Sequence, residues 1–303
     1  MSGRRRLAPR AAAPNAAKRA AFACLLPLAI ALAITLAPRP ARAGDPFEIQ
    51  VYDGTANTPG VFGLELHLND WATGHRDATP PEAPLHGQFH ATLEPSFGVT
   101  PFWELGAYLQ GAVRTDDGVV DWAGVKLRSK LVTPPSFDPH WRLGANFELA
   151  YLPDTYDHDR WGVEVRPIAA WHSDAWLFAF NPILDQPLAG SDASSGPSFE
   201  PCLKALRAVG PLGLGVEYYA TLGPVGAIEA LRDQEHYLFG AVDWLRGGPI
   251  ELNAAVGAGL TPESDGVVFK MILGYTFERD APTLPTTTPL PSASYEGRWK
   301  RRQ

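Results

Sequence analysis

Apolar and polar residues alternate along most of the chain between residues 61 and 277. Residues 141–151, WRLGANFELAY, place apolar side chains at every odd position and mostly polar or small ones between them. A period of two predicts a β-strand with two unlike faces. In the eighth and tenth such segments the alternation is ambiguous, and we expect a bulge in each. The predicted strands are near 61–69, 87–97, 102–114, 121–132, 141–152, 161–171, 175–184, 198–207, 212–222, 236–245, 249–260 and 266–277.

The connections between these segments alternate in length. Short turns fall at 98–101, 172–174, 209–211 and 246–248, with a somewhat longer link at 133–140, and mostly longer loops fall between them. Short turns on one side and long loops on the other are typical of outer-membrane barrels, and strands of about ten residues suit a tilted membrane crossing. The sequence therefore predicts an all-β fold, a 12-stranded antiparallel up-and-down transmembrane β-barrel over 61–277, with both termini in the periplasm.

A soluble β-sandwich or lipocalin-like barrel, with its apolar face inside, is the alternative. Three features favour the membrane barrel. The polar face is rich in glycine and small residues, and the last segment, KMILGYTF at 270–277, resembles the terminal strand that the barrel-assembly machinery reads. Aromatic residues also gather where interfacial girdles belong. They are Trp103, Trp141, Trp171 and Trp176 at short-turn ends and Tyr151 and Trp161 at long-loop ends.

The ends of the chain have different compositions. Residues 1–43 hold eight basic residues and no acid, an apolar run from Ala20 to Ala37, and Ala-Arg-Ala at 41–43. This pattern predicts a signal peptide cleaved after Ala43, and hence export to the outer membrane, in preference to a membrane anchor. Residues 44–60 form an N-terminal segment that either plugs the lumen from below or lies in the periplasm. Residues 278–303 are rich in Pro and Thr, which predicts a disordered periplasmic tail.

Composition excludes some classes of protein. Charged residues are 19% of the 303, below the roughly 25% of a soluble domain. One of the two cysteines lies in the predicted signal peptide, which leaves Cys202 without an internal partner. The net charge of −7 argues against a nucleic-acid partner. The predicted outer loops are acidic, so contact with lipopolysaccharide through divalent cations is one possible partnership.

Several short sequences carry a family resemblance. EPSFGVT at 94–100 followed by ELG at 104–106, and FEPCLK at 199–204 with GVEYY at 215–219, resemble hairpins of the outer-membrane proteins grouped with the meta-pathway of phenol degradation. EIQVY at 48–52 and LELHLN at 64–69 resemble the start of an uncharacterised branch of that group. The resemblance implies a transporter-like barrel over about 47–277. It implies no cofactor and no agreed set of functional residues.

A basic ladder stands out on the polar face. Lys126, Arg128 and Lys130 alternate along one strand and must therefore share a face. Folding the hairpins about their turns brings acids and polar residues to both flanks. The ladder either makes a transverse field that orients polar solutes or forms salt bridges that fill a narrow barrel. The expected neighbours are Glu104 and Tyr108 on one flank and Asn146, Glu148 and Arg142 on the other, and the further candidates for the lumen are Glu164, Arg166, His67 and His90.

Two chemical sites are weaker alternatives. His67 and His90 face the lumen nearly opposite each other in the expected register, and with Glu65 and Glu94 they suggest a transition-metal site. No close-spaced ligand motif supports it, so we expect no metal or cofactor. His172 and Ser173 are adjacent in a predicted turn, a poor geometry for a base and its nucleophile. We therefore expect no catalytic residues and no enzyme.

These observations predict a channel-like outer-membrane barrel that passes a small-molecule solute, an aromatic or amphipathic organic compound by family analogy. The principal alternative is a non-conducting structural or adhesive barrel with a salt-bridged lumen. An outer-membrane lipid hydrolase is a less favoured alternative.

Overall fold

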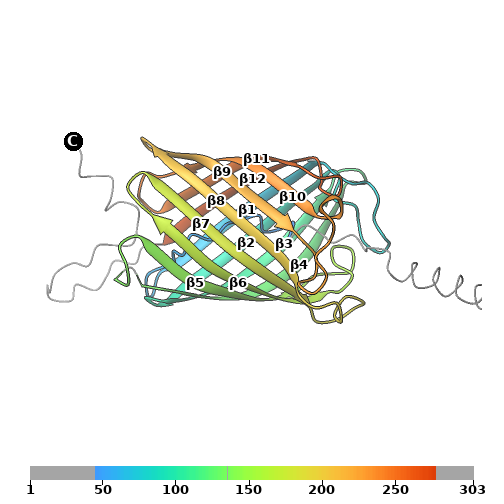
Figure 1. Ribbon diagram of the computed structural model, residues 1–303, viewed down its shortest axis with the longest axis horizontal. Coiled ribbons are helices and arrows are strands. Elements are labelled where there is room, and N and C mark those ends of the chain that lie inside the picture. The colour runs from blue at the N-terminus through green and yellow to red at the C-terminus, as the bar shows by residue number, and fades with distance from the viewer. Residues whose placement is uncertain (1–44, 135, 278–303) are drawn as a thin grey trace, which may run out of the picture. The chain divides into compact units, whose positions relative to one another are not determined.

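Twelve antiparallel strands form a closed barrel in the computed structural model, which describes residues 45–134 and 136–277 (Figure 1). This confirms the predicted fold class. The predicted signal peptide and the predicted tail lie outside the described residues. The strands are β1 (Phe62–Thr73), β2 (Gln88–Thr100), β3 (Trp103–Arg114), β4 (Val119–Val132), β5 (Trp141–Tyr151), β6 (Trp161–His172), β7 (Trp176–Pro187), β8 (Ser198–Val209), β9 (Leu212–Thr221), β10 (Glu235–Trp244), β11 (Ile250–Gly259) and β12 (Val267–Phe277).

Each strand pairs with the next in sequence, and β12 pairs with β1 to close the barrel. The bulges expected in the eighth and tenth strands are wrong, because β8 and β10 keep continuous register with both neighbours. Apolar residues on the lumen side, such as Leu206 and Phe239, blur the alternation there. An irregularity falls instead between β3 and β4, beside Gly124, whose φ of +145° suits glycine. A short 3₁₀ helix (Leu231–Asp233) lies in the loop between β9 and β10.

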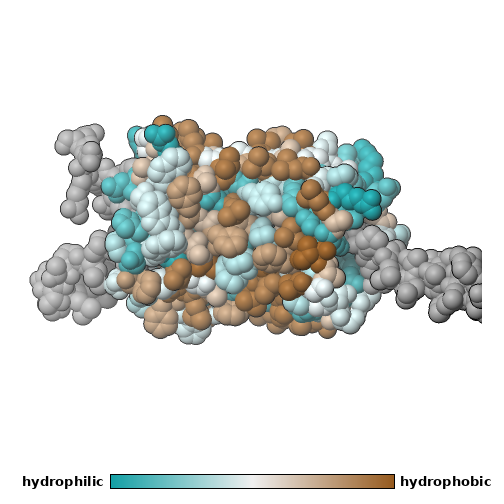
Figure 2. Space-filling model, in the orientation of Figure 1, coloured by the Kyte–Doolittle hydropathy of each residue, from teal (hydrophilic) through white to brown (hydrophobic). Residues whose placement is uncertain are grey.

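The outer face of the barrel is apolar. Leu105, Leu127 and Phe147 are 41%, 60% and 44% exposed, whereas Lys126 on the opposite face of β4 is 5% exposed. Figure 2 shows apolar side chains over the strands, with hydrophilic residues gathered mostly towards the two ends. Such a band is what a lipid-facing barrel presents and is unusual for a face in water. No helix in the described part of the chain is long and apolar enough to cross a membrane.

The N-terminal segment lies inside the barrel. Pro46 accepts hydrogen bonds from Asn69 and Trp71, near the long-loop end of β1. At the other end of the segment, Asn57 donates to Ser96 Oγ at 2.8 Å, near the short-turn end of β2. Residues 45–58, called the plug below, therefore run through the lumen antiparallel to β1, and the chain turns into β1 at the short-turn end. Of the two placements expected for this segment, the structure has the lumen.

Candidate functional site

The basic ladder lines one wall of the lumen and is paired with acids. Arg128 Nε donates to Glu94 Oε1 at 2.6 Å, and Arg128 Nη1 lies 2.8 Å from Glu104 Oε1. Lys130 Nζ lies 2.8 Å from the same oxygen, and Lys126 Nζ donates to Glu148 at 3.0 Å. Outside the barrel these charges would face lipid at a cost of about 2–4 kcal/mol each near the bilayer centre, so the lumen face is the one that can hold them.

The strand register explains the flanks of the ladder. Glu104 lies opposite Lys130 and Tyr108 opposite Lys126, across the β3–β4 pair. On the other flank Glu148 lies opposite Arg128 and Asn146 opposite Lys130.

Arg142 is not a flank of the ladder, contrary to the sequence expectation. The pairing of β4 with β5 ends at Val132 and Gly144, two residues short of it. Its guanidinium Nη1 instead donates to the backbone oxygens of Asp138 and Trp141, at 2.6 and 2.9 Å. Arg142 therefore belongs to the short-turn end of the barrel.

We call the lumen face of β2–β6, with its cations and carboxylates, the charged wall. Arg166 on β6 joins this wall to the plug. Its Nε donates to Glu164 at 2.7 Å, and its Nη1 lies 3.1 Å from Glu48 Oε1 and donates to the backbone oxygen of Gln50 at 3.2 Å. The guanidinium also lies 4.6 Å from the ring centre of Tyr52, at cation–π distance. Arg166 is 2% exposed, so removing it would leave the buried Glu164 without its cation and Glu48 with Lys126 alone.

The plug makes further polar bonds along its length. Asp45 forms an ion pair with Lys126, and the hydroxyls of Tyr52 and Tyr108 are 2.6 Å apart. Asn181 on β7 forms a two-sided bond: the Tyr52 N–H donates to Asn181 Oδ1 at 2.7 Å, and Asn181 Nδ2 donates to the Tyr52 oxygen at 3.0 Å. Because an unpaired backbone group buried away from water is costly, side chains such as Asn181 here take the place of a neighbouring strand.

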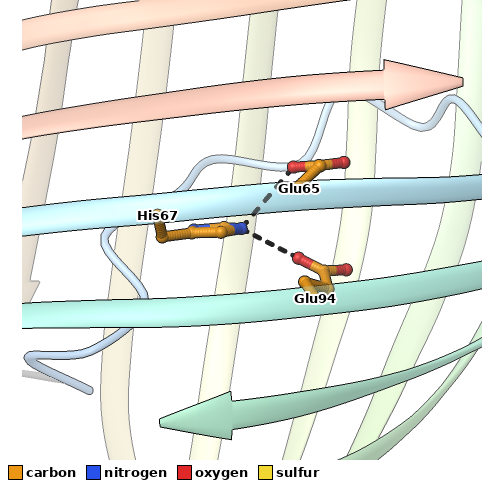
Figure 3. A group of neighbouring side chains, drawn as sticks. All are labelled: Glu65, His67 and Glu94. Atoms are coloured by element: carbon orange, nitrogen blue, oxygen red, sulfur yellow. Dashed lines mark hydrogen bonds and ion pairs between the residues drawn. The ribbon is translucent and has the colours of Figure 1, made fainter. Parts of the chain in front are cut away.

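The two histidines do not share a site. Figure 3 shows the imidazole of His67 pointing between the carboxylates of Glu65 and Glu94. Its Nε2 lies 2.9 Å from Glu94 and 3.5 Å from Glu65. His90 instead stacks on the ring of Phe47 in the plug, with ring centres 4.0 Å apart.

A metal at His67 is disfavoured by its surroundings. Glu94 already binds Arg128, whose positive charge opposes a bound cation. Both histidines face the lumen on adjacent strands, as expected, with His67 opposite Thr92 and His90 opposite Asn69. It is His67, and not His90, that lies between Glu65 and Glu94, so the cluster is better explained as an ion-pair arrangement than as a two-histidine metal site.

The wall formed by β7–β12 differs from the charged wall. It contributes a cluster of apolar side chains: Leu177, Ala179, Ile183, Cys202 and Leu206 are all buried and pack with Val51 of the plug. Its charges form a second network around Glu217, which pairs with Lys270 and lies 3.2 Å from Lys204. We call this side the mixed wall.

Two cavities lie beside the plug. The larger has a volume of about 300 Å³ and is lined by plug residues, by Lys204 and Leu177, and at the short-turn end by residues 246–248. The smaller, about 50 Å³, is lined by Trp71, Glu200 and Phe239 towards the long-loop end. Gln50 borders both. Next to Gln50, Lys270 Nζ donates to the backbone oxygen of Ile49 at 2.9 Å.

Sequence reasoning missed the residues that dock the plug. Asn181 and Tyr52 were not among the candidates, although the strand-like FEIQVY at 47–52 marked the plug as an extended segment. The hydrolase alternative finds no support in the turn after β6. His172 Nε2 donates to the backbone oxygen of Asp53 at 2.9 Å, and Ser173 Oγ accepts from the Trp176 N–H at 3.0 Å. In the described structure these two neighbours are each engaged elsewhere.

The solved structures to which this chain is similar are outer-membrane proteins. The COG4313 outer membrane channel from Pseudomonas putida F1 is similar over 76% of this chain and 100% of that chain, at 13% identity and a TM-score of 0.54. KdgM porin is similar over 71% of this chain and 99% of that chain, at 8% identity and a TM-score of 0.47. LpxR from Salmonella typhimurium is similar over 71% and 100%, at 7% identity and a TM-score of 0.39. Known protein families and curated protein sequences give no match.

At these identities the likeness to solved structures shows the fold alone. Together with the apolar outer face, it defines the class of the fold: this chain is an outer-membrane-type β-barrel. Whether a solute passes through the barrel, and which one, depends on the side chains that line the lumen of this chain.

Proposed function

We propose that this protein is a channel in the outer membrane that the plug closes, and that solutes pass along the mixed wall when the plug shifts. The observation that carries the proposal is the pair of cavities on either side of Gln50, both bordered by the plug. If the lumen were filled only to stabilise the barrel, a separate segment bordered by two cavities would serve no purpose. A segment that runs through a lumen can also open or close the pore by moving.

The mixed wall is the favoured path because the plug is held there by fewer charges. On the charged wall, Asp45 and Glu48 form ion pairs with Lys126 and Arg166. On the mixed wall, apolar packing around Val51 is joined by polar bonds to the plug backbone, from Asn181 to Tyr52 and from Lys270 to the Ile49 oxygen. Neither Asp45 nor Glu48 forms an ion pair with this wall in the described structure. Apolar contacts do not fix one orientation, so the plug can slide there without leaving a buried charge unpaired.

We propose small amphipathic organic molecules as the cargo. The larger cavity places Leu177, Leu245 and Ile272 close to Lys204 and Asp243, so one solute can meet apolar and charged groups together. This lining is consistent with the resemblance of EPSFGVT and FEPCLK to hairpins of proteins grouped with the meta-pathway of phenol degradation. Export by the signal peptide, insertion by the barrel-assembly machinery and contact of the outer loops with lipopolysaccharide belong to the same proposal.

Single-channel recording in planar bilayers tests the gate. One variant replaces residues 47–56 with Gly and Ser, which keeps the chain length and removes the docking side chains. The matched control replaces residues 225–230, in the exposed loop after β9, in the same way. We expect brief or small openings from the wild type and the control, and a persistent, several-fold larger conductance from the plug variant. A folded plug variant that stays silent would refute the channel.

Liposome swelling tests the cargo. The plug variant should admit benzoate faster than arabinose if the mixed wall favours amphipathic solutes. Equal rates would remove that part of the proposal and leave the gate intact.

The second candidate is a non-conducting structural or adhesive barrel. The ion pairs of the charged wall favour it, because Arg128, Glu94 and Glu104 fill much of the lumen on that side. Silence of the folded plug variant is the result that this candidate predicts.

A further inference from the structure

Three long loops meet beside the mouth of the barrel, outside the lumen. The Ala83 N–H donates to the backbone oxygen of Thr155 at 2.9 Å, which joins the β1–β2 loop to the β5–β6 loop. The Leu188 N–H donates to the Trp161 oxygen at 2.7 Å, which holds the start of the β7–β8 loop against the same region. His158 lies where the three loops converge, with a carboxylate from each of them nearby.

Glu82 fixes the orientation of the His158 imidazole. Its Nδ1 lies 3.0 Å from Glu82 Oε1, and because a carboxylate only accepts, Nδ1 carries the hydrogen. Glu82 Oε1 also accepts from the His158 backbone N–H at 3.0 Å, which fixes the carboxylate in place. With Nδ1 protonated, Nε2 presents its lone pair to the other side of the ring whenever the imidazole is neutral. Metal-binding histidines are commonly oriented by a carboxylate in this way.

Two carboxylates face Nε2. It lies 3.4 Å from Asp159 Oδ1 and 3.3 Å from Asp192 Oδ2, longer than a good hydrogen bond. In a tetrahedral Zn²⁺ site, with bonds of about 2.0–2.2 Å, neighbouring ligand atoms lie roughly 3.3–3.5 Å apart. The three ligand atoms are mutually within 4.8 Å, so one ion can reach all of them.

Asp159 supplies the second, independent observation. Its side chain is 5% exposed. Among the described residues no lysine or arginine forms an ion pair with it: its ion-pair partner is His158, and its Oδ1 also accepts a long hydrogen bond from the Asp192 N–H at 3.4 Å. A buried carboxylate without a permanent cation is costly unless something neutralises it. The β7–β8 loop reaches it through Gly190, with φ of +78°, where a Cβ would collide with the carboxylate.

We propose that His158 Nε2, Asp159 and Asp192 bind a divalent transition-metal ion such as Zn²⁺, with Glu82 as the positioning residue for the imidazole. The ligand set comes from this chain alone, with a water molecule to complete the tetrahedron. One nitrogen and two carboxylates form a donor set that suits zinc. A bound ion ties the β5–β6 and β7–β8 loops together, and the β1–β2 loop follows through Glu82.

Protons compete with the metal for His158. Partial burial lowers the pKa of His158, but the hydrogen bond with Glu82 and the negative charge of Asp159 outweigh it and leave the pKa above its ordinary value. The titration is therefore best made at pH 8, because metal binding needs a neutral imidazole.

Isothermal titration calorimetry with Zn²⁺ tests the site on the whole refolded barrel after removal of metals with a chelator. We expect one equivalent to bind the wild type and at least a hundredfold weaker binding to His158→Ala, with Glu82→Gln weakened about 10–100-fold. The matched control is Asp154→Asn, which removes an acid of the same loop that pairs with Arg160 instead. It should bind as the wild type does.

Co²⁺ absorption provides a second readout, since a tetrahedral site gives intense visible bands that adventitious surface binding does not. Heat-modifiable migration in gels shows that each variant folds, and His158→Gln replaces His158→Ala if that variant does not. A wild type that binds no Zn²⁺, or a folded His158 variant with unchanged affinity, would overturn the proposal and leave the cluster as a set of ion pairs.

Discussion

The two walls of the lumen hold the plug in different ways. On the charged wall, β2–β6 present buried cations and carboxylates, and these bind the acidic side chains of the plug. On the mixed wall, β7–β12 present apolar side chains around Val51, and the charges pair mainly with one another. Both cavities are lined by residues of both walls, the larger by Lys130 and Lys204 and the smaller by Arg166 and Phe239.

The difference shows how one segment can be both fixed and movable. Removing one partner of a buried ion pair is strongly destabilising, because the remaining charge has no water to solvate it. An apolar contact is non-directional, and its cost grows only with the area exposed. The charged wall therefore acts as the anchor of the plug, and the mixed wall is the side from which it can withdraw.

The largest effect is expected from Arg166→Met, which removes the link between the charged wall and the plug. Glu164 loses the cation paired with it, whereas Glu48 keeps Lys126 at 3.7 Å, and breaking a buried pair such as Arg166–Glu164 costs about 3–5 kcal/mol. We expect a matching drop in the free energy of unfolding, measured by urea titration in lipid vesicles, and more frequent channel opening in planar bilayers.

Lys204→Met is the matched control on the mixed wall. Lys204 pairs with Glu217 and Asp243, but Glu217 keeps Lys270, and Asn253 Nδ2 remains bonded to Asp243. It should lower stability less than Arg166→Met and leave the opening frequency unchanged. If the two substitutions change the opening frequency equally, the claim that the charged wall anchors the plug and the mixed wall does not would be wrong.

A smaller effect is expected from Asn181→Ala, which removes the two-sided bond to Tyr52. The Tyr52 N–H and oxygen lose their partner, at about 1–3 kcal/mol for a buried unsatisfied group. Because the bond belongs to the plugged state alone, we expect roughly a tenfold or greater rise in open probability in single-channel records. Ser129→Ala, at a hydroxyl bonded to Trp103 on β3, is the control and should gate normally. An Asn181→Ala channel with wild-type gating would mean that the plug does not leave when the pore opens.

The smallest effect is expected from Lys130→Gln at the border of the larger cavity. Lys130 is partly accessible, so its loss exposes Glu104 to solute more than it destabilises the barrel. Reversal potentials in a salt gradient should shift towards cation preference, by about twofold in the permeability ratio. Arg207→Gln removes the same charge beside Trp176 and should leave selectivity unchanged. An unchanged reversal potential for Lys130→Gln would show that ions avoid this border.

The barrel could be predicted from sequence because a period of two is a local property of each strand. The flanks of the ladder followed from the turns, which set register, and Glu104 lies opposite Lys130 as the hairpin geometry required. The prediction that Arg142 flanks the ladder was wrong because the long turn before β5 ends the pairing of β4 with β5 before Arg142 is reached.

The docking of the plug could not be predicted in the same way. FEIQVY at 47–52 alternates like a strand, yet it pairs with no neighbouring strand, and its backbone bonds go to side chains distant in sequence, such as Asn181, Arg166 and Lys270. The stacking of Phe47 on His90, which separates the two histidines, depends on that docking. The apolar lumen residue Phe239 likewise faces the plug side and contradicts the simple pattern of polar inside and apolar outside.

The most direct test of the gate uses a native side chain beneath the plug. Cys202 is 1% exposed, and its Sγ lies 3.9 Å from the backbone oxygen of Gln50, on the mixed wall. A charged methanethiosulfonate reagent is added while single channels are recorded, with Cys202→Ser as the control. We expect the reagent to block current only after the channel has opened, and never in the control. Two results would contradict a plug that withdraws from this wall. One is reaction of Cys202 at the same rate in closed and open channels, and the other is an open channel in which Cys202 stays unreactive.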